Sequence, residues 1–228
     1  QAAKVRYMFG GKATTPLVIR TTFGAGSRSA SQHSQALYPI FTHIPGLKVV
    51  VPSNPYDAKG LLIQSIRDND PVIFLENKML YDLEGEVPDQ SYTIPFAEAN
   101  VVREGKDALI VAIGRMVEFS IKAAEQLAKE GIQCSILDPR TLSPIDEELI
   151  LDMVDECGRL VIVDESYPRC SIASDISSLV AEKAFDALKG PIIKVTAQHS
   201  PVPYAPNLED TYLPSKEKII DAVQKVVS

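Results

Sequence analysis

Short runs of apolar residues recur along the chain, and most are apolar throughout rather than alternating with polar positions. They cover residues 16–21, 47–51, 71–76, 108–114, 133–137, 160–163 and 192–195. Strands that are apolar at nearly every position are typical of a parallel sheet that helices cover on both faces. The pattern therefore predicts an α/β fold built around buried parallel strands.

The segments between these strands have the periodicity of amphipathic helices. We expect helices over residues 31–41, 55–66, 116–129, 143–154, 171–188 and 215–226. Asn54, Ser143 and Ser215 are N-cap residue types, and prolines follow the first two of them. The first nine residues, ended by Gly10 and Gly11, resemble the last turns of a helix. We therefore expect the chain to lack the N-terminal part of a longer protein.

The strand and helix pattern is interrupted once, between residues 78 and 105, by Pro88, Pro95 and several acidic residues. This segment favours a linker that leads into an edge strand. We therefore expect two α/β units, residues 1–90 and residues 91–228. In the second unit strands and helices alternate with short connections, which predicts an open, doubly wound sheet.

Composition narrows the class of protein. The chain is 45% hydrophobic and 23% charged, as is ordinary for a globular protein, and its net charge is −7. It has no basic stripe, which argues against nucleic acid, and no apolar run of the roughly 20 residues that span a membrane. Cys134, Cys157 and Cys170 lack the short spacing of a zinc or redox site. Reduced thiols favour a cytoplasmic protein.

One histidine lies in an unusual setting. His33 stands within the run Ser-Gln-His-Ser-Gln, between a strand-to-loop passage containing Gly24 and Gly26 and the apolar strand over residues 47–51. An imidazole has an unperturbed pKa of about 6.5, so it can exchange protons near neutral pH. From spacing alone, His33 is equally an inert residue at the start of a helix. His43 and His199 have no partner pattern, and we expect them to be structural.

The chain closely resembles the beta subunits of thiamine-diphosphate-dependent 2-oxo acid and acetoin dehydrogenases. The resemblance runs along its whole length, over the His33 motif and residues 45–51, 57–61, 66–71, 75–77, 138–141 and 201–205. It implies the later part of a pyrimidine-binding parallel-sheet domain, followed by a transketolase C-terminal-type doubly wound domain. It also implies that His33 is the catalytic histidine, which moves or stabilises a proton in the reaction and in the transfer to lipoamide.

The same resemblance implies cofactors and partners. Thiamine diphosphate is the cofactor, and its Mg²⁺ is held by an alpha subunit. The family's glutamate for the aminopyrimidine precedes the region covered here, so no cofactor-binding residue is assigned. Many members bind a structural K⁺, and the matched positions are Leu17, Ser65, Ile66, Asp68 and Asp70, largely through main-chain oxygens. The implied partners are the alpha subunit of a heterotetramer, a second beta subunit and a lipoyl acyltransferase core.

Several functions remain open. Residues 21–26 depart from the run frequent in pyruvate dehydrogenase beta subunits, which favours acetoin cleavage. Oxidation of pyruvate or a branched-chain 2-oxo acid is the close alternative. A second alternative is that the covered region acts only as an assembly and docking module. A third alternative is a homodimeric transketolase-like enzyme.

This chain by itself should be inactive and should bind thiamine diphosphate weakly, because the resemblance assigns the main cofactor contacts elsewhere. Isothermal titration of the isolated chain with thiamine diphosphate and Mg²⁺ measures this. Tight binding would contradict the expectation.

Overall fold

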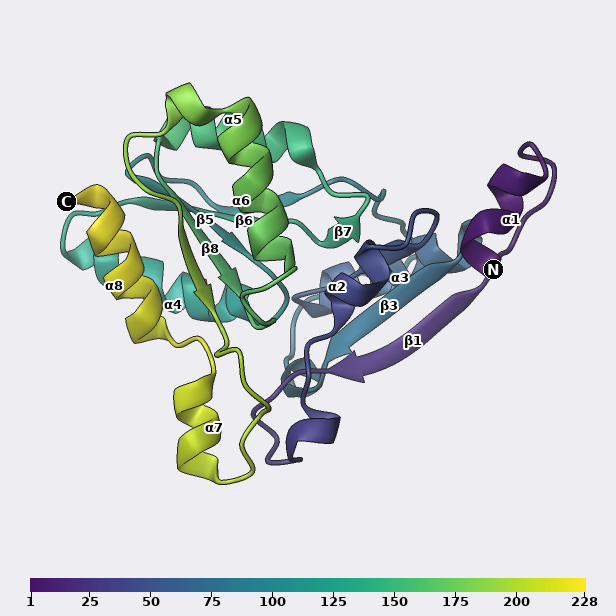
Figure 1. Cartoon of the computed structure of the whole chain (residues 1–228), viewed down its shortest axis with the longest axis horizontal. Helices are drawn as coiled ribbons and strands as arrows, with labels where there is room; N and C mark the ends of the chain where they lie inside the picture. The colour runs from purple at the N-terminus through teal and green to yellow at the C-terminus, as the bar shows by residue number, and fades with distance from the viewer.

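The computed structural model describes residues 1–228 and places the two termini at opposite ends of its long axis (Figure 1). The helices are α1 (Ala2–Met8), α2 (Tyr38–Thr42), α3 (Pro55–Arg67), α4 (Met116–Lys129), α5 (Glu147–Cys157), α6 (Ile172–Lys183), α7 (Pro206–Tyr212) and α8 (Lys216–Val227). Short 3₁₀ helices are η1 (Ser31–His33), η2 (Lys78–Leu80) and η3 (Phe185–Ala187).

The first sheet has the strand order β1-β3-β2-β7. Its strands are β1 (Val18–Phe23), β2 (Lys48–Val50), β3 (Val72–Asn77) and β7 (Thr141–Ser143). The central strand β3 pairs in parallel with both β1 and β2, and its apolar residues are buried. Strand β7 comes from the second half of the chain and pairs antiparallel with β2. This pairing ties the two halves together through the main chain.

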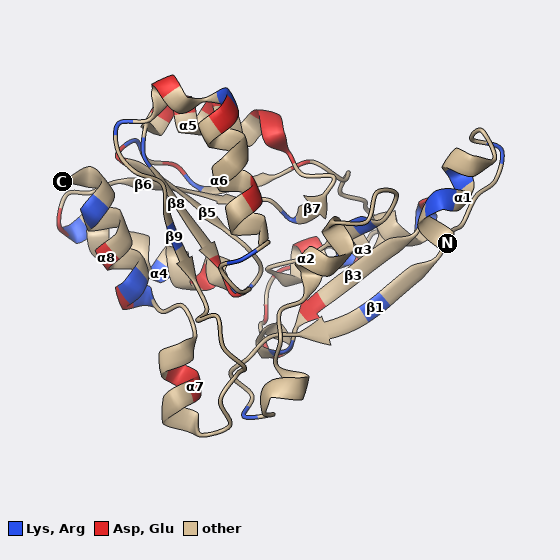
Figure 2. Cartoon of the chain, in the orientation of Figure 1, with Lys and Arg blue, Asp and Glu red and all other residues tan.

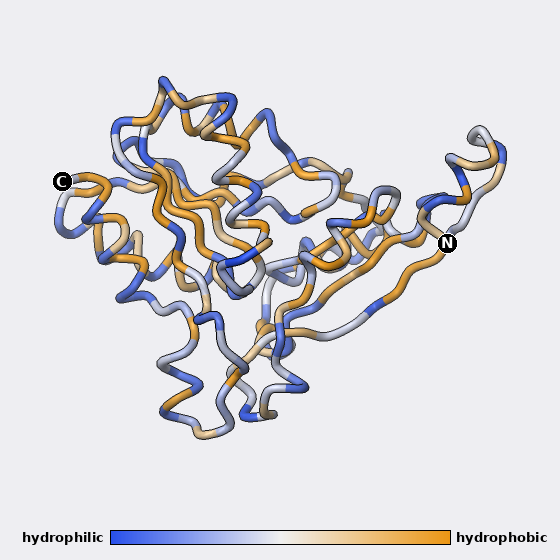
Figure 3. The backbone as a smooth tube through the Cα atoms, in the orientation of Figure 1, coloured by the Kyte–Doolittle hydropathy of each residue, from blue (hydrophilic) through white to orange (hydrophobic).

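The second sheet has the order β4-β6-β5-β8-β9. Its strands are β4 (Asn100–Arg103), β5 (Ala108–Ala112), β6 (Cys134–Asp138), β8 (Leu160–Asp164) and β9 (Ile193–Thr196). All pairs are parallel except that of the edge strand β4 with β6. Every residue of β5, β6 and β8 is buried, and these strands form the hydrophobic centre seen in Figure 3. The doubly wound sheet expected from the sequence is confirmed.

Two clusters of apolar side chains cover the faces of this sheet. Ile110 and Val161 face α4 and α8, whereas Leu109 and Ile162 face α5 and α6, because successive side chains of a strand point to opposite faces. The cluster under α5 and α6 continues into the first half through residues such as Phe23. One of the hydrophobic clusters therefore spans the two sheets.

Several boundaries confirm the sequence-based expectations. Helix α4 covers the expected range, α1 ends before Gly10, and β4 is an edge strand after the linker. The Asn54 side chain accepts a hydrogen bond from the Asp57 N–H at 2.8 Å and caps α3. Ser215 caps α8 in the same way. These elements depend on local signals that the sequence displays directly.

Two expectations about the first half are wrong. Residues 31–41 form no continuous helix but the turn η1 followed by α2. Pro39 lies in the first turn of α2, and because proline has no N–H and clashes with the preceding turn, a helix can begin but not pass through there. Strand β1 is not buried on both faces, since it is the edge strand, and Leu17 and Ile19 on this edge are 43% and 46% exposed.

The second half also departs from expectation at two places. The helix expected from residue 143 begins at Glu147, where the Asp146 carboxylate accepts from the Leu149 N–H at 3.2 Å. Ser143 instead belongs to β7. Helix α7 was not expected, because its sequence is polar and only seven residues long. At Ser143 the pairing of β7 with β2 overrides the local preference for a helix start.

A buried ion pair joins the two halves. Arg140, just before β7, places Nη2 at 2.8 Å from Asp57 Oδ1, and the two side chains are 11% and 1% exposed. Nearby, Ser53 donates a hydrogen bond to the buried Asp138 carboxylate at the end of β6.

Lys, Arg, Asp and Glu otherwise lie scattered over both halves, with acidic side chains on α5 (Figure 2). No helix is both long and apolar enough to cross a membrane.

Replacing Arg140 by alanine should destabilise the protein by about 3 kcal/mol, because it leaves the Asp57 carboxylate buried without its cation. Urea unfolding followed by circular dichroism measures the change. Lys183→Ala, which breaks the exposed pair with Glu147, is the matched control and should change stability little. Equal effects from the two substitutions would contradict a structural role for the buried pair.

Candidate functional site

His33 lies at the edge of the first sheet where the parallel strands end. Strand β1 ends at Phe23, the chain continues as a loop, and His33 is the last residue of η1. Its side chain is exposed, and its main-chain carbonyl accepts a hydrogen bond from Lys78 Nζ, just after β3. Ligands of open α/β sheets bind outside the carboxyl ends of the strands. The structure therefore places His33 where a substrate can reach it.

The loop between β1 and η1, which we call the His33 loop (residues 24–30), has an unusual backbone. Gly24 and Gly26 have φ angles of +102° and +109°, and Arg28 and Ala30 also have positive φ. A Cβ at Gly24 would lie 2.6 Å from Asn77 Nδ2, and one at Gly26 would lie 2.8 Å from Arg115 Nη1. Only glycine fits both positions, because a side chain would meet the φ restriction and a clash together.

A buried glutamate of the second domain supports the start of this loop. Glu165, directly after β8, accepts hydrogen bonds from the Ala25 N–H at 2.6 Å and from the Asn77 amide at 2.7 Å. Burial raises the pKa of Glu165 to about 7, although these hydrogen bonds and the charge of Arg115 act to lower it. The start of the loop is therefore hydrogen-bonded to a carboxyl group whose pKa lies near neutral pH.

The neighbouring Asp164 anchors the segment that follows His33. The Tyr38 hydroxyl donates a hydrogen bond to its carboxylate, which also accepts from the Ser166 N–H at 2.7 Å. Both side chains are fully buried, and burial raises both pKa values. The Tyr38 ring also packs edge-on against Phe23 at 5.4 Å between centroids. Residues on both sides of the His33 loop are thus fixed to the end of β8.

The five positions matched to a K⁺ site lie together at the other end of the first sheet. The Leu17 carbonyl accepts from the Val72 N–H at 2.8 Å, and Ser65 is buried near the end of α3. Ile66 is exposed at the end of α3. The Asp68 carboxylate lies 2.6 Å from Lys48 Nζ, and Asp70 pairs with Arg6. The carboxylates therefore face protein cations, and no cluster of three or more His, Cys, Asp or Glu side chains suits a metal ion. The K⁺ site stays a prediction.

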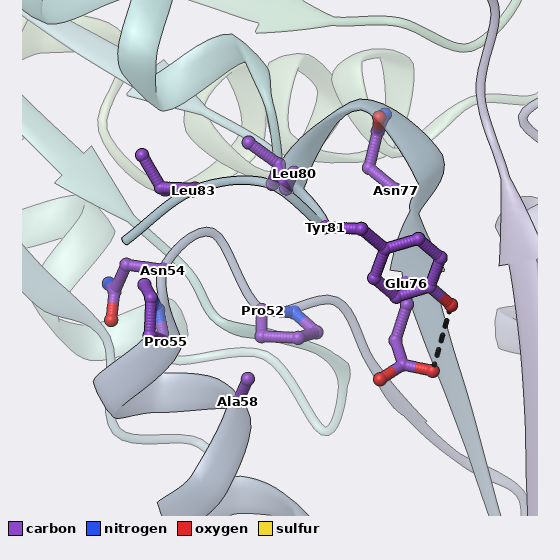
Figure 4. A pocket seen from close by; sticks show the side chains of 9 residues that line it. All are labelled: Pro52, Asn54, Pro55, Ala58, Glu76, Asn77, Leu80, Tyr81 and Leu83. Carbon is purple, nitrogen blue, oxygen red and sulfur yellow. Dashed lines mark hydrogen bonds between the residues drawn. The ribbon is translucent and has the colours of Figure 1, made fainter. Parts of the chain in front are cut away.

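A small pocket of about 190 Å³ lies between the ends of β2 and β3 (Figure 4). Glu76 and Tyr81 line one side, with 3.4 Å between the hydroxyl and Glu76 Oε2, and Pro52 lies opposite. Ligand pockets are usually at least about 300 Å³ in volume. His33 does not line this pocket, and Arg20 already pairs with Glu76 at 2.8 Å. The pocket is therefore not the candidate site.

The sequence singled out His33 but not the acids that hold its loop. Asp164 and Glu165 directly follow the apolar run over residues 160–163, and polar residues after a buried strand lie at the edge where ligands bind. The position of Asp164 and Glu165 after a buried strand was therefore a signal for these two residues. Glu209 of α7 accepts a hydrogen bond from the Gly26 N–H of the loop at 2.7 Å. The sequence offered no signal for it, because its helix is short and the contact joins distant parts of the chain.

Two family descriptions match the chain. "Transketolase, pyrimidine binding domain" matches residues 1–84, and "Transketolase, C-terminal domain" matches residues 97–219. Among solved structures, a split gene transketolase (inactive beta4 tetramer) covers 99% of this chain and 73% of its own, with a TM-score of 0.77. Its identity is 22%, so this likeness concerns the fold.

Curated relatives match the whole chain. The acetoin:2,6-dichlorophenolindophenol oxidoreductase subunit beta of Cupriavidus necator is 62% identical and that of Bacillus subtilis 55%, each over 100% of this chain. The match covers 67% and 66% of those proteins, so the chain spans about two thirds of their length. The pyruvate dehydrogenase E1 component subunit beta of Rhizobium meliloti is 45% identical over 99% of this chain and 49% of its own length.

Glu165 should make the protein less stable as the pH rises from about 4.5 to about 7, because its pKa is raised to about 7 in the folded state, and Asp138, whose pKa is also raised to about 7, should act in the same direction. In this range the folded protein keeps a proton that the unfolded chain releases. Glu165→Gln should flatten the curve of unfolding free energy against pH, measured by urea titration. The exposed Glu156→Gln is the control. A curve for Glu165→Gln that runs parallel to the wild type would contradict the assignment.

Proposed function

The chain belongs to the family of transketolase-type beta subunits of acetoin and pyruvate dehydrogenases, and from that premise we propose that it serves a thiamine-diphosphate-dependent enzyme that cleaves acetoin. One two-carbon fragment leaves as acetaldehyde, and the remaining two-carbon group passes to lipoamide in a multienzyme complex. The observation that carries this choice is the identity of 62% to an acetoin relative against 45% to a pyruvate relative, over nearly the same residues. The departure of residues 21–26 from the run frequent in pyruvate dehydrogenase beta subunits supports it.

In this proposal His33 is the group that moves a proton. Its exposed ring at the carboxyl edge of the first sheet is open to a bound substrate, while its main chain is held by Lys78. An imidazole nitrogen takes the proton of the acetoin hydroxyl and returns a proton later in turnover. General acid–base catalysis of this kind contributes roughly a hundredfold to ten-thousandfold in rate.

The residues of this chain do not by themselves fit thiamine diphosphate. When bound, the cofactor supplies the carbanion chemistry of the reaction. The buried carboxylates that touch the His33 loop, Glu165 and Glu209, already accept hydrogen bonds from its backbone, and Glu76 is paired with Arg20. We therefore assign the cofactor and its Mg²⁺ to an alpha subunit and to parts of the beta subunit outside this chain.

A K⁺ ion near α3 is part of the same proposal. Lys48 and Arg6 already neutralise Asp68 and Asp70, so the ion would be held by main-chain oxygens such as that of Leu17. Carbonyl oxygens are suitable ligands for a hard cation.

The remaining partners follow from family membership. They are an alpha subunit, a second copy of this beta subunit and a lipoyl acyltransferase core. We place the enzyme in the cytoplasm, because its three cysteines are free thiols, two of them buried.

A 2-oxo acid dehydrogenase is the second candidate. The pyruvate dehydrogenase beta subunits, at 45% and 44% identity, favour pyruvate over a branched-chain acid. An assembly role without catalysis is the third. The covered part would then dock other subunits without touching substrate.

Replacing His33 by alanine in the full-length beta subunit, assembled with its alpha partner, should lower turnover of acetoin by at least about a hundredfold. The assay contains thiamine diphosphate, Mg²⁺ and an artificial electron acceptor, with pyruvate and a branched 2-oxo acid in parallel. Sedimentation should show an unchanged assembly, because the His33 side chain is exposed.

His43→Ala is the matched control, since His43 is also exposed and lies at the end of α2. Full activity of the His33→Ala enzyme would move the proposal to the assembly role. Preference of the wild-type enzyme for a 2-oxo acid would keep the family but overturn acetoin as the substrate.

A further inference from the structure

The strand order of the second sheet reverses at β5, and the His33 loop lies at the carboxyl ends of β5 and β8, a place that we call the crevice. In the second sheet the chain leaves β5 for β6 on one side and later returns to β8 on the other. In open α/β sheets, ligands bind at the carboxyl ends of the strands where the order reverses in this way. Here those ends carry Arg115 after β5 and Glu165 after β8.

The contacts in this crevice come from the first domain. Glu165 accepts the Ala25 N–H at 2.6 Å, and the Gly26 backbone lies so close to Arg115 that a Cβ would be 2.8 Å from Nη1. A Cβ at Gly114 would likewise lie 3.1 Å from Val51 Cγ1. The crevice therefore holds a segment of the same chain where related folds hold a small molecule.

A second carboxylate, on α7, accepts hydrogen bonds from the same loop at Gly26 and Arg28. Glu209 is completely buried and accepts from the Gly26 N–H at 2.7 Å and the Arg28 N–H at 3.2 Å. The Gly26 N–H bonds Oε1, whereas Oε2 accepts both the Arg28 N–H and, at 2.9 Å, the Arg28 guanidinium. Past the loop, Ser31 donates to the Val202 carbonyl at 2.5 Å. These bonds connect the second domain to the backbone of Gly26 and Arg28 before Ala30 and to the Ser31 hydroxyl after it.

The loop needs this support. Arg28 and Ala30 have φ angles of +57° and +61°, a conformation that costs free energy for residues other than glycine and persists only where its surroundings impose it. A buried carboxylate is itself costly unless donors satisfy it. Glu209 and the loop therefore stabilise each other, and neither conformation is set by local sequence.

We propose that Glu209 is a positioning residue, which fixes the His33 loop and so sets the place of the His33 imidazole for proton transfer. The proposal rests on the function proposed above. Glu209 does not touch substrate, and it acts through the backbone of Gly26 and Arg28.

The test uses the full-length beta subunit assembled with its alpha partner. Glu209→Ala should lower kcat by up to roughly a hundredfold, the effect of displacing a catalytic group by about 1 Å, with little change in KM. Glu209→Gln keeps one accepting oxygen and should recover part of the loss. Asp210→Asn is the matched control, since Asp210 reaches only the outer end of the Arg28 side chain at 2.7 Å, and it should leave kcat unchanged.

A second readout does not depend on turnover. Diethylpyrocarbonate modifies exposed imidazoles, and peptide mass spectrometry gives the rate for each histidine. Glu209→Ala should change the rate at His33 and leave the rate at His43 unchanged. If the alanine variant does not assemble, the same comparison is made with Glu209→Gln.

The outcomes separate the two proposals. If His33→Ala retains activity, the proposed function fails, whatever Glu209 does. If His33→Ala loses activity while the Glu209 variants change neither kcat nor the modification of His33, the positioning role is overturned. Loss of kcat with equal changes in modification at His33 and His43 would indicate general loosening of the fold and would also overturn it.

Discussion

Buried carboxylates of the second domain accept hydrogen bonds from the first, and this constraint fixes how the two halves of the chain meet. Asp138 is bonded by Ser53, Asp164 by Tyr38, and Glu165 by the Ala25 backbone. A carboxyl group removed from water without a donor costs several kcal/mol. The halves therefore cannot slide or rotate against each other without leaving these groups unsatisfied.

The same constraint positions the candidate catalytic group. His33 lies on a loop whose backbone conformation is unfavourable by itself, with positive φ at Arg28 and Ala30. The second domain holds this loop with carboxylates at the end of β8 and on α7. A reactive side chain on a loop thereby gains the rigidity of the sheet behind it, which general acid–base catalysis requires. In the proposed function the second domain is thus part of the candidate site, because it holds the loop that carries His33.

Hydrophobic packing also holds the two halves of the chain together. One cluster of buried side chains runs from Phe23 and Tyr38 of the first half to the residues under α5 and α6. Strand β7 adds main-chain hydrogen bonds to β2, and the Asp57–Arg140 pair closes beside it. Core packing is not directional, whereas hydrogen bonds are. The core therefore brings the two halves together, and the hydrogen bonds to the buried carboxylates fix their relative orientation.

Elements with strong local signals were predictable. The period of α4, the Asn54 cap of α3 and the fully apolar strands β5 and β8 identify themselves in the sequence. The motif around His33 identified a candidate catalytic histidine, and its role stays a prediction. The helix expected over residues 31–41 failed at Pro39, and the expected start at Ser143 failed because that residue pairs with β2. In the second case a long-range contact outweighed a local preference.

By itself, then, the sequence determined the α/β class, the order of most strands and helices apart from β7 and α7, the family and the identity of the candidate histidine, because periodicity, caps and motifs act within a few residues along the chain. Only the tertiary structure decided that β7 joins the first sheet, that the His33 loop lies at the carboxyl ends of β5 and β8, and that Glu165 and Glu209 support it. Glu209 meets its partners from more than 180 positions away along the chain. No local pattern encodes such a contact, because it exists only once burial has removed both groups from water.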